Sequence, residues 1–219
     1  MYLILLGAPG TGKGTQAKIL AGRYSWLHLS TGDMLREAVA AGTKLGRDAR
    51  AYMDRGELVP DVLVIRMLVD RIGRPDAGEG FVLDGFPRNL AQAKALDASL
   101  LEKGKAIDLA LNVVVPDEEL LRRLAGRWLC RDCGAIYSDK NPQRTPGRCD
   151  NCGGELYQRE DDRPEMAKTR LELQRPPPDL IQHYADRQRL VEINGSQSVE
   201  AVTAEMIRAI ESRRDNGAK

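Results

Sequence analysis

Short runs of apolar residues alternate along the chain with segments whose apolar positions recur at helical spacing. The short runs, each typical of a buried strand in a parallel sheet, cover residues 2–6, 81–83, 109–115 and 190–193. The helical patterns cover residues 13–24, 90–101, 118–124 and 199–212. Because strands and helices alternate, we predict an α/β fold in which helices flank a parallel β-sheet core.

Two segments interrupt this alternation. Residues 30–72 have a helical pattern, and residues 127–163 contain all the cysteines. We interpret both as insertions into a single domain, whose core then consists of residues 1–29, 73–126 and 164–219.

Prolines and polar residues predict where the last helices begin and end. A helix that begins near Pro164 should end before residues 176–178, which are all proline, because proline disfavours a preceding helical residue and removes backbone donors. We therefore expect a bend at Arg175 and a new helix after it. The polar tail, residues 213–219, is predicted to fray.

Composition and charge restrict the class of protein. Of the 219 residues, 42% are hydrophobic and 30% are charged, as in globular proteins. The 33 Lys and Arg residues almost balance the 32 Asp and Glu residues, which argues against nucleic acid or an anionic membrane as a partner. The apolar start has no basic leader and reaches glycine at Gly7, so we predict neither signal peptide nor membrane span and a cytoplasmic location.

A glycine-rich turn, residues 7–15, separates the first predicted strand from the first predicted helix. Backbone N–H groups in such a turn and at the helix N-terminus converge on phosphate, and Lys13 adds a positive charge. The usual pattern has Ser or Thr directly after the lysine, whereas here Gly14 intervenes before Thr15. The turn therefore predicts a phosphate-binding loop of a variant type.

The four cysteines form two Cys-x-x-Cys pairs separated by fifteen residues. This spacing is typical of a four-thiolate zinc site, and a site with four protein ligands leaves no position for water. We therefore predict a structural zinc rather than a catalytic one. Free or disulfide-bonded thiols are the alternative, but they suit two such pairs poorly in a chain without other cysteines. The predicted ligands are Cys130, Cys133, Cys149 and Cys152.

Three motifs together resemble those of the adenylate kinase family. They are the variant glycine-rich loop, Ser-Thr-Gly-Asp-Met-Leu-Arg at residues 30–36 and Leu-Asp-Gly-Phe-Pro-Arg at residues 83–88. The resemblance extends from residue 2 to about residue 210. It implies a P-loop NTPase-like core, a helical insertion at about 30–72 that binds the nucleoside monophosphate, and a zinc-binding lid at about 127–163. It also implies Mg²⁺-dependent phosphoryl transfer, ATP + AMP = 2 ADP, which maintains adenine nucleotide balance, with ATP, AMP and ADP as substrates.

The resemblance also implies an AMP site. Thr31 and Gln92 match the positions that bind adenine, and an amide that offers both a donor and an acceptor suits that base. Pyrimidine monophosphate kinases commonly have Ala at the position of Thr31, so this residue favours AMP. Arginine forks suit phosphate. The AMP-binding residues expected from the family are Thr31, Arg36, Glu57, Leu58, Val59, Gly85, Phe86, Pro87, Arg88, Gln92, Arg159 and Arg170.

On the ATP side, the family places arginines around the lid. Arg127 and Arg159 flank the cysteine module, so lid closure would bring both to the phosphates, and Asp161 and Asp162 match acidic positions that orient such arginines. Gln197 matches a position whose backbone carbonyl faces adenine. The ATP-binding residues expected from the family are Gly10, Thr11, Gly12, Lys13, Gly14, Thr15, Arg123, Arg127, Ile136, Tyr137 and Gln197.

Phosphoryl transfer depends on positioning and on neutralising negative charge. Mg²⁺ and five cationic residues are expected to supply that charge, and Asp84, at the carboxyl end of a predicted strand, is expected to hold Mg²⁺ through water. His28 and His183 lie outside every motif, and the AMP phosphate is already ionised, so no general base is required. The predicted catalytic residues are Lys13, Arg88, Arg127, Arg159 and Arg170.

Three other functions are compatible with parts of the sequence. A related kinase could use GTP as donor or another nucleoside monophosphate as acceptor. A zinc-ribbon P-loop NTPase could bind nucleic acid, but the near-neutral charge and the few aromatic residues near the cysteines argue against it. A regulatory protein that binds nucleotide without turnover would not be expected to keep the phosphate-binding arginines. Nothing in the sequence marks an interface, so we expect a monomer.

Overall fold

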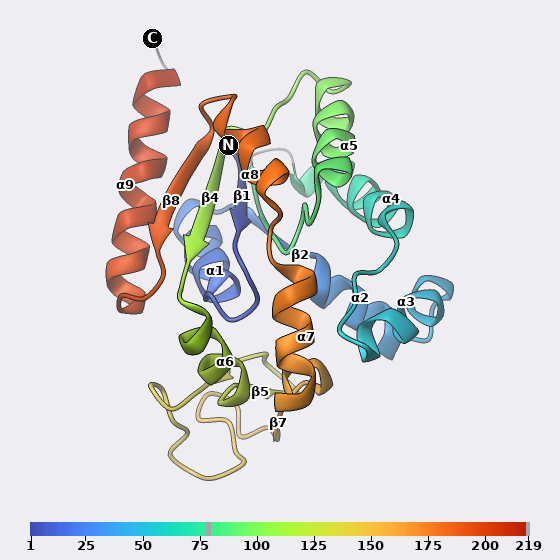
Figure 1. Cartoon of the computed structure of the whole chain (residues 1–219), viewed down its shortest axis with the longest axis vertical. Coiled ribbons are helices and arrows are strands. Elements are labelled where there is room, and N and C mark those ends of the chain that lie inside the picture. The colour runs from blue at the N-terminus through green and yellow to red at the C-terminus, as the bar shows by residue number, and fades with distance from the viewer. Residues whose placement is uncertain (78–79, 218–219) are drawn as a thin grey trace.

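A five-stranded parallel sheet forms the centre of the computed structural model, which describes residues 1–77 and 80–217 (Figure 1). Each strand runs parallel to its neighbours. This arrangement confirms the predicted α/β fold class. In spatial order the strands are β2 (Leu27–Ser30), β3 (Phe81–Asp84), β1 (Tyr2–Leu6), β4 (Leu109–Val114) and β8 (Leu190–Asn194).

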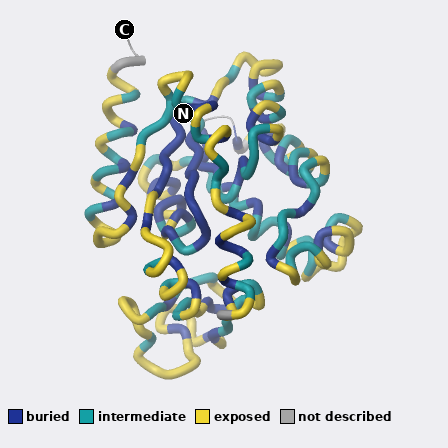
Figure 2. The backbone as a smooth tube through the Cα atoms, in the orientation of Figure 1, coloured by how far each residue is buried: buried dark blue, intermediate teal, exposed yellow. Residues whose placement is uncertain are grey.

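Helices cover both faces of the sheet because successive strand residues point to opposite sides. In β1, Leu3 and Leu5 pack with α1 (Lys13–Tyr24) and α9 (Val199–Gly217) on one face. Ile4 and Leu6 belong to the core on the other face. The helices on that second face are α4 (Asp61–Ile72), α5 (Leu90–Leu101) and α8 (Pro178–Ala185). Figure 2 shows that the central strands between these layers are mostly buried, whereas the edge strand β8 is mostly intermediate or exposed.

The helical insertion follows β2 and consists of α2 (Thr31–Ala40), α3 (Lys44–Asp54) and α4, and a short 3₁₀ turn (Pro75–Ala77) follows it. The cysteine-bearing segment, residues 127–163, lies between α6 (Asp117–Ala125) and α7 (Pro164–Gln174). We call it the lid segment. It contains an antiparallel sheet, in the order β6 (Ile136–Tyr137), β5 (Trp128–Cys130) and β7 (Leu156–Tyr157), and a 3₁₀ turn (Glu160–Asp162).

The structure differs from the predicted elements in two places. Strand β2 was not predicted, because His28 separates its two leucines, Leu27 and Leu29, and no continuous apolar run remains. The prediction that the tail frays from Arg213 is wrong, since α9 continues to Gly217 and the Arg213 guanidinium donates to the carbonyls of Asp108 and Gln188. Residues 218–219 of that tail lie outside the described residues. The bend at Arg175 is confirmed: its backbone is extended between α7 and α8.

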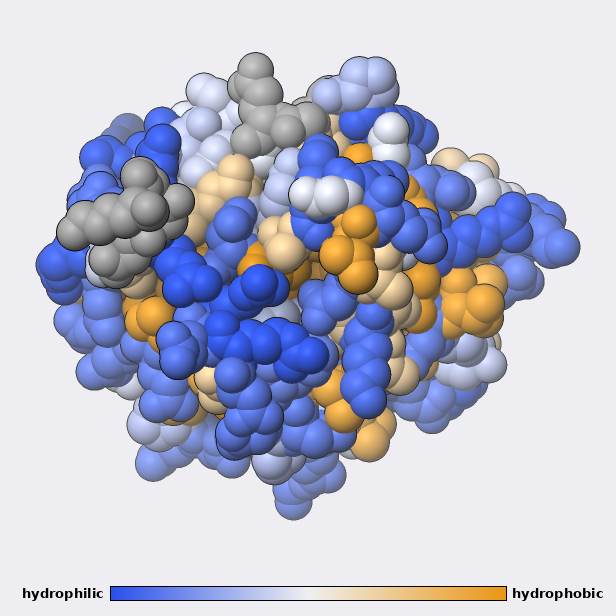
Figure 3. Space-filling model, turned by 90° about the horizontal axis from the view of Figure 1, so that it is seen from above, coloured by the Kyte–Doolittle hydropathy of each residue, from blue (hydrophilic) through white to orange (hydrophobic). Residues whose placement is uncertain are grey.

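The face of the molecule opposite the lid segment is largely polar. Seen from the end opposite the lid segment, most side chains are hydrophilic and the hydrophobic ones form small separate groups (Figure 3). No helix in residues 1–77 or 80–217 is long and apolar enough to cross a membrane.

Candidate functional site

The glycine-rich loop connects the carboxyl end of β1 to α1. Gly7, Gly10 and Gly12 all have positive φ angles, of +137°, +86° and +94°. A Cβ atom on Gly7 would lie 2.6 Å from the Val113 carbonyl oxygen, so a side chain there would collide with the backbone of β4. Gly12 caps α1 without a side-chain hydrogen bond. The first N–H groups of α1 and the positive end of its dipole therefore suit an anion such as phosphate. Gly14 and Thr15 continue into the first turn of α1.

Lys13 folds back over this loop. Its Nζ donates to the carbonyls of Gly7 and Ala8, both at 2.7 Å, and to Thr11 Oγ1 at 3.2 Å. The side chain is buried, and burial lowers the pKa of Lys13 to about 7 although the charge of Asp84 opposes that shift. In the protein without nucleotide, the Lys13 amine therefore titrates near neutral pH.

We expect the affinity for ATP to fall by about tenfold for each pH unit above 7, because the phosphates favour charged Lys13 and binding then requires uptake of a proton. Calorimetric titrations in buffers of different ionisation enthalpy would measure both affinity and proton uptake. The Lys13→Arg variant is the control, since its guanidinium stays charged and its affinity should not vary in this way. An equal pH dependence in Lys13→Arg would assign the titration to another group.

Asp84 lies at the end of β3 beside the loop. A Cβ atom on residue 14 would come within 3.1 Å of Asp84 Oδ2, so the carboxylate is adjacent to the first turn of α1. Gly14, which departs from the usual motif, leaves room for this carboxylate. Carboxylate oxygens are ligands that suit Mg²⁺ directly or through water, so the donor chemistry at this point fits the predicted metal.

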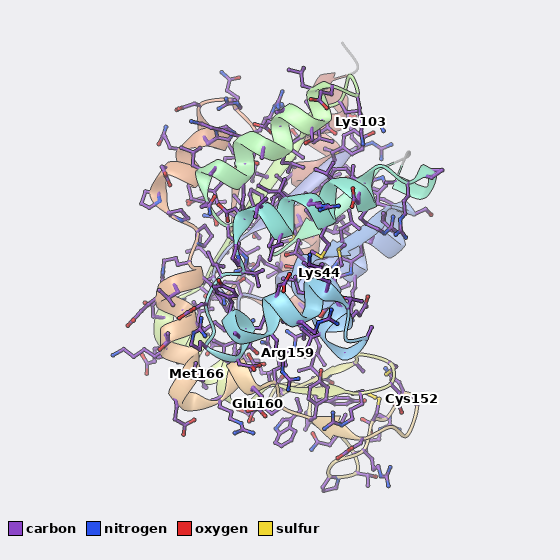
Figure 4. The ribbon with its side chains drawn as sticks, turned by 90° about the vertical axis from the view of Figure 1, so that its right-hand side faces the viewer. Lys44, Lys103, Cys152, Arg159, Glu160 and Met166 are labelled. Carbon is purple, nitrogen blue, oxygen red and sulfur yellow. The ribbon has the colours of Figure 1, made fainter. Side chains whose placement is uncertain are left out.

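Arginines of the predicted acceptor side surround Asp33. The Asp33 carboxylate accepts from Arg36 at 2.5 Å and from Arg159 of the lid segment at 3.1 Å. Burial acts to raise the pKa of Asp33, but the Arg36 and Arg159 charges prevail and lower it to about 2. Figure 4 shows Arg159 at the junction between the insertion helices and the lid segment. The lid segment and the helical insertion thus already meet in this structure.

Arg88 and Thr31 meet at one carbonyl. Arg88 Nε donates to the Gly85 oxygen at 2.6 Å, and Thr31 Oγ1 donates to the same oxygen at 3.0 Å. Arg88 Nη1 lies 3.4 Å from both the carbonyl oxygen and the Oε1 of Gln174. Burial lowers the pKa of Arg88, although Asp84 opposes that shift.

The predicted base-binding residues are not all presented to a ligand. Gln92 is buried, but its Oε1 accepts from the Arg88 backbone at 2.7 Å and its Nε2 donates to Asp61 at 2.6 Å, so both ends of the amide are used within the protein. Glu57 pairs with Arg55 at 2.7 Å on the surface. Three other residues of this set, Val59, Phe86 and Pro87, are buried, and Leu58 is partly buried.

Two cations of the site share one buried carboxylate. Asp162 has no exposed surface and accepts from Arg127 Nε at 2.8 Å and from Arg127 Nη2 at 2.5 Å. Arg170 Nη1 donates to Asp162 as well and lies 3.3 Å from Asp161. Burial lowers the pKa of both Arg159 and Arg170 to about 10, and the neighbouring Arg127 adds to this effect. The positive charges therefore lie close together and away from water.

Gln174 is a site residue that the sequence analysis missed. Its Oε1 lies 3.4 Å from both Arg88 and Arg170, and its Nε2 donates to the Gly56 carbonyl of the insertion at 2.7 Å. The signal available in the sequence was its position four residues after Arg170, on the same face of a helix.

The four cysteine sulfurs lie within 4.8 Å of one another. Cys130 and Cys152 are 3.4 Å apart and Cys133 and Cys149 are 3.5 Å apart, close to the ~3.8 Å that tetrahedral zinc with thiolate ligands requires. The donor set therefore fits zinc. Tyr137 belongs to this cluster: its hydroxyl lies 3.3 Å from Cys149 Sγ and accepts from the Asp150 N–H at 2.7 Å. The structure does not bring that hydroxyl to the phosphate loop. Ile136, beside it, is partly buried.

Two further residues were predicted for ATP. Arg123 lies on α6, and Gln197 lies in the loop that precedes α9. Arg123 donates to Glu119 at 2.8 Å and to the Gly195 carbonyl at 3.0 Å. The Gln197 side chain donates to the Asn194 carbonyl of its own loop and to Glu205 of α9, so its amide nitrogen is engaged within the protein.

A glycine-rich loop at the carboxyl end of a parallel sheet, with largely buried cations from the core and the lid segment near it, defines a P-loop phosphotransferase that acts on nucleotides. A sequence profile described as adenylate kinase matches residues 5–189. The chain is 50% identical to adenylate kinases of Thermodesulfovibrio yellowstonii over 204 residues, Archaeoglobus fulgidus over 208 and Caldicellulosiruptor bescii over 214. These alignments cover 92%, 94% and 96% of this chain and 95%, 96% and 99% of the relatives.

The chain belongs to the adenylate kinase family of nucleoside monophosphate kinases. The membership confirms the resemblance seen in the motifs. A GTP-dependent kinase and a nucleic-acid-binding NTPase are correspondingly not favoured.

Proposed function

We propose that this chain catalyses the reversible, Mg²⁺-dependent reaction ATP + AMP = 2 ADP. The observation that carries the proposal is the set of buried and largely buried cations around the phosphate loop, contributed by the core and the lid segment. Such a set neutralises the charge that develops on a phosphoryl group in transit, and little covalent chemistry is needed from the protein. The cations are Lys13, Arg88, Arg127, Arg159 and Arg170.

The roles that we assign on the ATP side follow from the loop. Residues 10–15 bind the phosphates through backbone N–H groups, and Lys13 leaves the Gly7 and Ala8 carbonyls to pair with them. Arg123 and the backbone at Gln197 bind the base. We assign the Tyr137 side chain to the cysteine cluster, so that only the backbone of residues 136–137 is available to ATP.

On the AMP side, we assign the phosphate to Arg36, Arg88, Arg159 and Arg170. AMP must then replace the Asp33 carboxylate on Arg36 and Arg159, since both guanidinium groups are paired with it here. We assign adenine recognition to Thr31 and Gln92. The Gln92 amide must then give up its hydrogen bond to Asp61 and form one to the base. Bidentate guanidinium groups are suited to the phosphate and a buried amide to the base edge.

Asp84 is the residue that we expect to hold Mg²⁺ through water. When bound with ATP, the ion supplies positive charge to the phosphates. The side chains of this chain orient the two nucleotides, and the insertion (30–72) and lid segment (127–163) exclude water so that transfer prevails over hydrolysis. The division into these parts and core segments 1–29, 73–126 and 164–219 is part of the proposal, as are a monomeric state and a cytoplasmic location.

The four cysteines are proposed to hold a structural Zn²⁺ in the lid segment. This ion would cross-link β5 to the loop before β7, because each Cys-x-x-Cys pair supplies two of four ligands. Such a cross-link stabilises a segment that has only a small hydrophobic core of its own.

Removing the metal is expected to lower the thermal midpoint by about 5–10 °C, because binding energy at a structural zinc site is also folding energy. Scanning calorimetry with and without a chelator measures the shift, and limited proteolysis should then cut within residues 131–155. The Cys149→Ser variant should already have the low midpoint and should not respond to the chelator. A chelator-insensitive midpoint in the unmodified protein, with no bound zinc by elemental analysis, would contradict the assignment.

The proposed reaction is tested by incubating the protein with MgATP and each of AMP, GMP, CMP and UMP, and following the nucleoside diphosphates by chromatography. ADP formed only with AMP supports the assignment of Thr31 and Gln92. Transfer to CMP or UMP would keep the mechanism and overturn the acceptor. ATP breakdown that ignores every acceptor would reject the kinase proposal itself.

A further inference from the structure

Glu119, on the first turns of α6, has no role in the proposed mechanism and is the centre of a charge cluster. Because residues three and four apart share a helix face, its carboxylate meets both Arg122 and Arg123. It accepts from Arg122 at 2.9 Å through each oxygen and from Arg123 Nε at 2.8 Å. Lys140 of the lid segment lies 3.3 Å away. The Glu119 side chain is 25% exposed, so it is partly shielded from water.

The Arg123 guanidinium is held along two of its edges. Its Nε donates to Glu119. Its Nη2 donates at 3.0 Å to the carbonyl of Gly195, which lies 72 residues away in the sequence. The arginine can therefore present its flat face and Nη1 to a ligand, and the flat face of a guanidinium suits stacking on an aromatic ring such as a base. Without Glu119, the side chain would keep only one of these two anchors.

The second anchor is itself fixed. The Gly195 N–H donates to the Val114 carbonyl at 2.9 Å. A Cβ atom on residue 195 would lie 2.5 Å from Val113 Cγ1 and 2.7 Å from Val115 Cγ2, so this carbonyl sits where only glycine fits. The Arg123 guanidinium is thus hydrogen-bonded to two fixed groups. One is the Gly195 carbonyl of the core, and the other is the Glu119 carboxylate, which also contacts Lys140 of the lid segment.

We propose that Glu119 is a positioning residue of the ATP site, which holds the Arg123 guanidinium against Gly195 in the orientation that binds the donor nucleotide. The inference rests on the proposed function, since Arg123 is assigned to ATP there. Hydrogen bonds from three cations keep the Glu119 carboxylate ionised, and its pKa is far below the usual range because Arg122 and Arg123 donate to it.

The test is a set of steady-state measurements on Glu119→Gln, in which ATP and AMP are varied in turn. We expect KM for ATP to rise about three- to fivefold, while KM for AMP and the thermal midpoint change little. Glu118→Gln is the matched control: it removes the same charge from the same helix turn, and no hydrogen bond or ion pair of the Glu118 side chain is found among the described residues. It should leave both KM values within about twofold of the starting protein.

Two further variants show whether Glu119 acts through Arg123. Arg123→Ala should raise KM for ATP, and adding Glu119→Gln to it should raise KM no further, because the group being positioned is gone. An ATP effect of Arg123→Ala without one of Glu119→Gln would overturn this inference and leave the proposed function intact. An unchanged KM for ATP in Arg123→Ala would overturn the donor role of Arg123 and the inference with it. Equal rises for ATP and AMP in Glu119→Gln would indicate a merely structural role.

Discussion

Replacing Arg88 with lysine is expected to lower kcat by about 10²- to 10³-fold with a much smaller change in KM for AMP. Lysine keeps the positive charge but lacks the planar guanidinium with its several donors. It therefore cannot contact both the Gly85 carbonyl and the Gln174 side chain as Arg88 does. A charge that is displaced by about 1 Å stabilises the moving phosphoryl group poorly. Single-turnover measurements with saturating MgATP and AMP would isolate the chemical step.

Arg66→Lys provides the matched control. Arg66 lies on an exposed position of α4, and no hydrogen bond or ion pair of its side chain is found in the part of the chain that the structure describes. It should retain full activity. If Arg88→Lys kept more than about a tenth of kcat, the fork would not be required and Arg88 would act as a simple point charge.

Most of the fold could be predicted from the sequence because it depends on local pattern. Strand β1 and helices α1 and α5 begin and end at the predicted residues, and local signals mark three of these boundaries: Gly7 follows β1, Gly12 precedes α1, and the N-cap residue Asn89 precedes α5. Strand β2 was not predicted because it is an edge strand of four residues. Such a strand needs few apolar positions, and so it leaves no clear apolar run in the sequence. The extension of α9 depends on the contacts of Arg213 with distant carbonyls, which no local pattern reports.

The candidate site could be predicted only as a set of residues, and not as a set of contacts. Motifs identified Arg159, Gln92 and Arg88, but not the partners of their side chains. Asp33, Asp61 and Gln174 lie respectively 126, 31 and 86 residues away from them in the sequence, so no local pattern pairs them. Tyr137 was assigned to ATP from its neighbours in the family, whereas its hydroxyl lies against Cys149. The chemistry of a side chain depends on such long-range pairing, and a single sequence does not contain it.

These partners share a physical role. Arg36 and Arg159 are paired with Asp33, and Arg127 and Arg170 are paired with Asp162, so four guanidinium groups are kept close together without nucleotide. Without the carboxylates, mutual repulsion and burial would oppose this arrangement. The two aspartates differ in exposure: the Asp33 side chain is 43% exposed and can release its partners to phosphate, whereas Asp162 has no exposed surface and remains a permanent partner.

Asp162→Asn is therefore expected to lower the free energy of unfolding by about 3–5 kcal/mol, because two buried guanidinium groups lose the charge that compensates them. For a chain of this size that corresponds to a fall of about 6–20 °C in the thermal midpoint. Denaturant unfolding at equilibrium gives the free energy, and calorimetry gives the midpoint. The same change should reduce turnover, since Arg127 and Arg170 would no longer be held near the phosphate loop.

Comparison with Asp161→Asn separates a buried partner from a neighbouring charge. Asp161 is 17% exposed and has one contact of 3.3 Å with Arg170, so its loss should cost about 1 kcal/mol or less. A double variant gives the sharper test. Adding Arg127→Met to Asp162→Asn removes one of the two uncompensated cations and should restore part of the lost stability, although Arg127→Met alone should be destabilising. Additive losses in the double variant would show that Asp162 contributes through packing, and that its charge does not hold the arginines together.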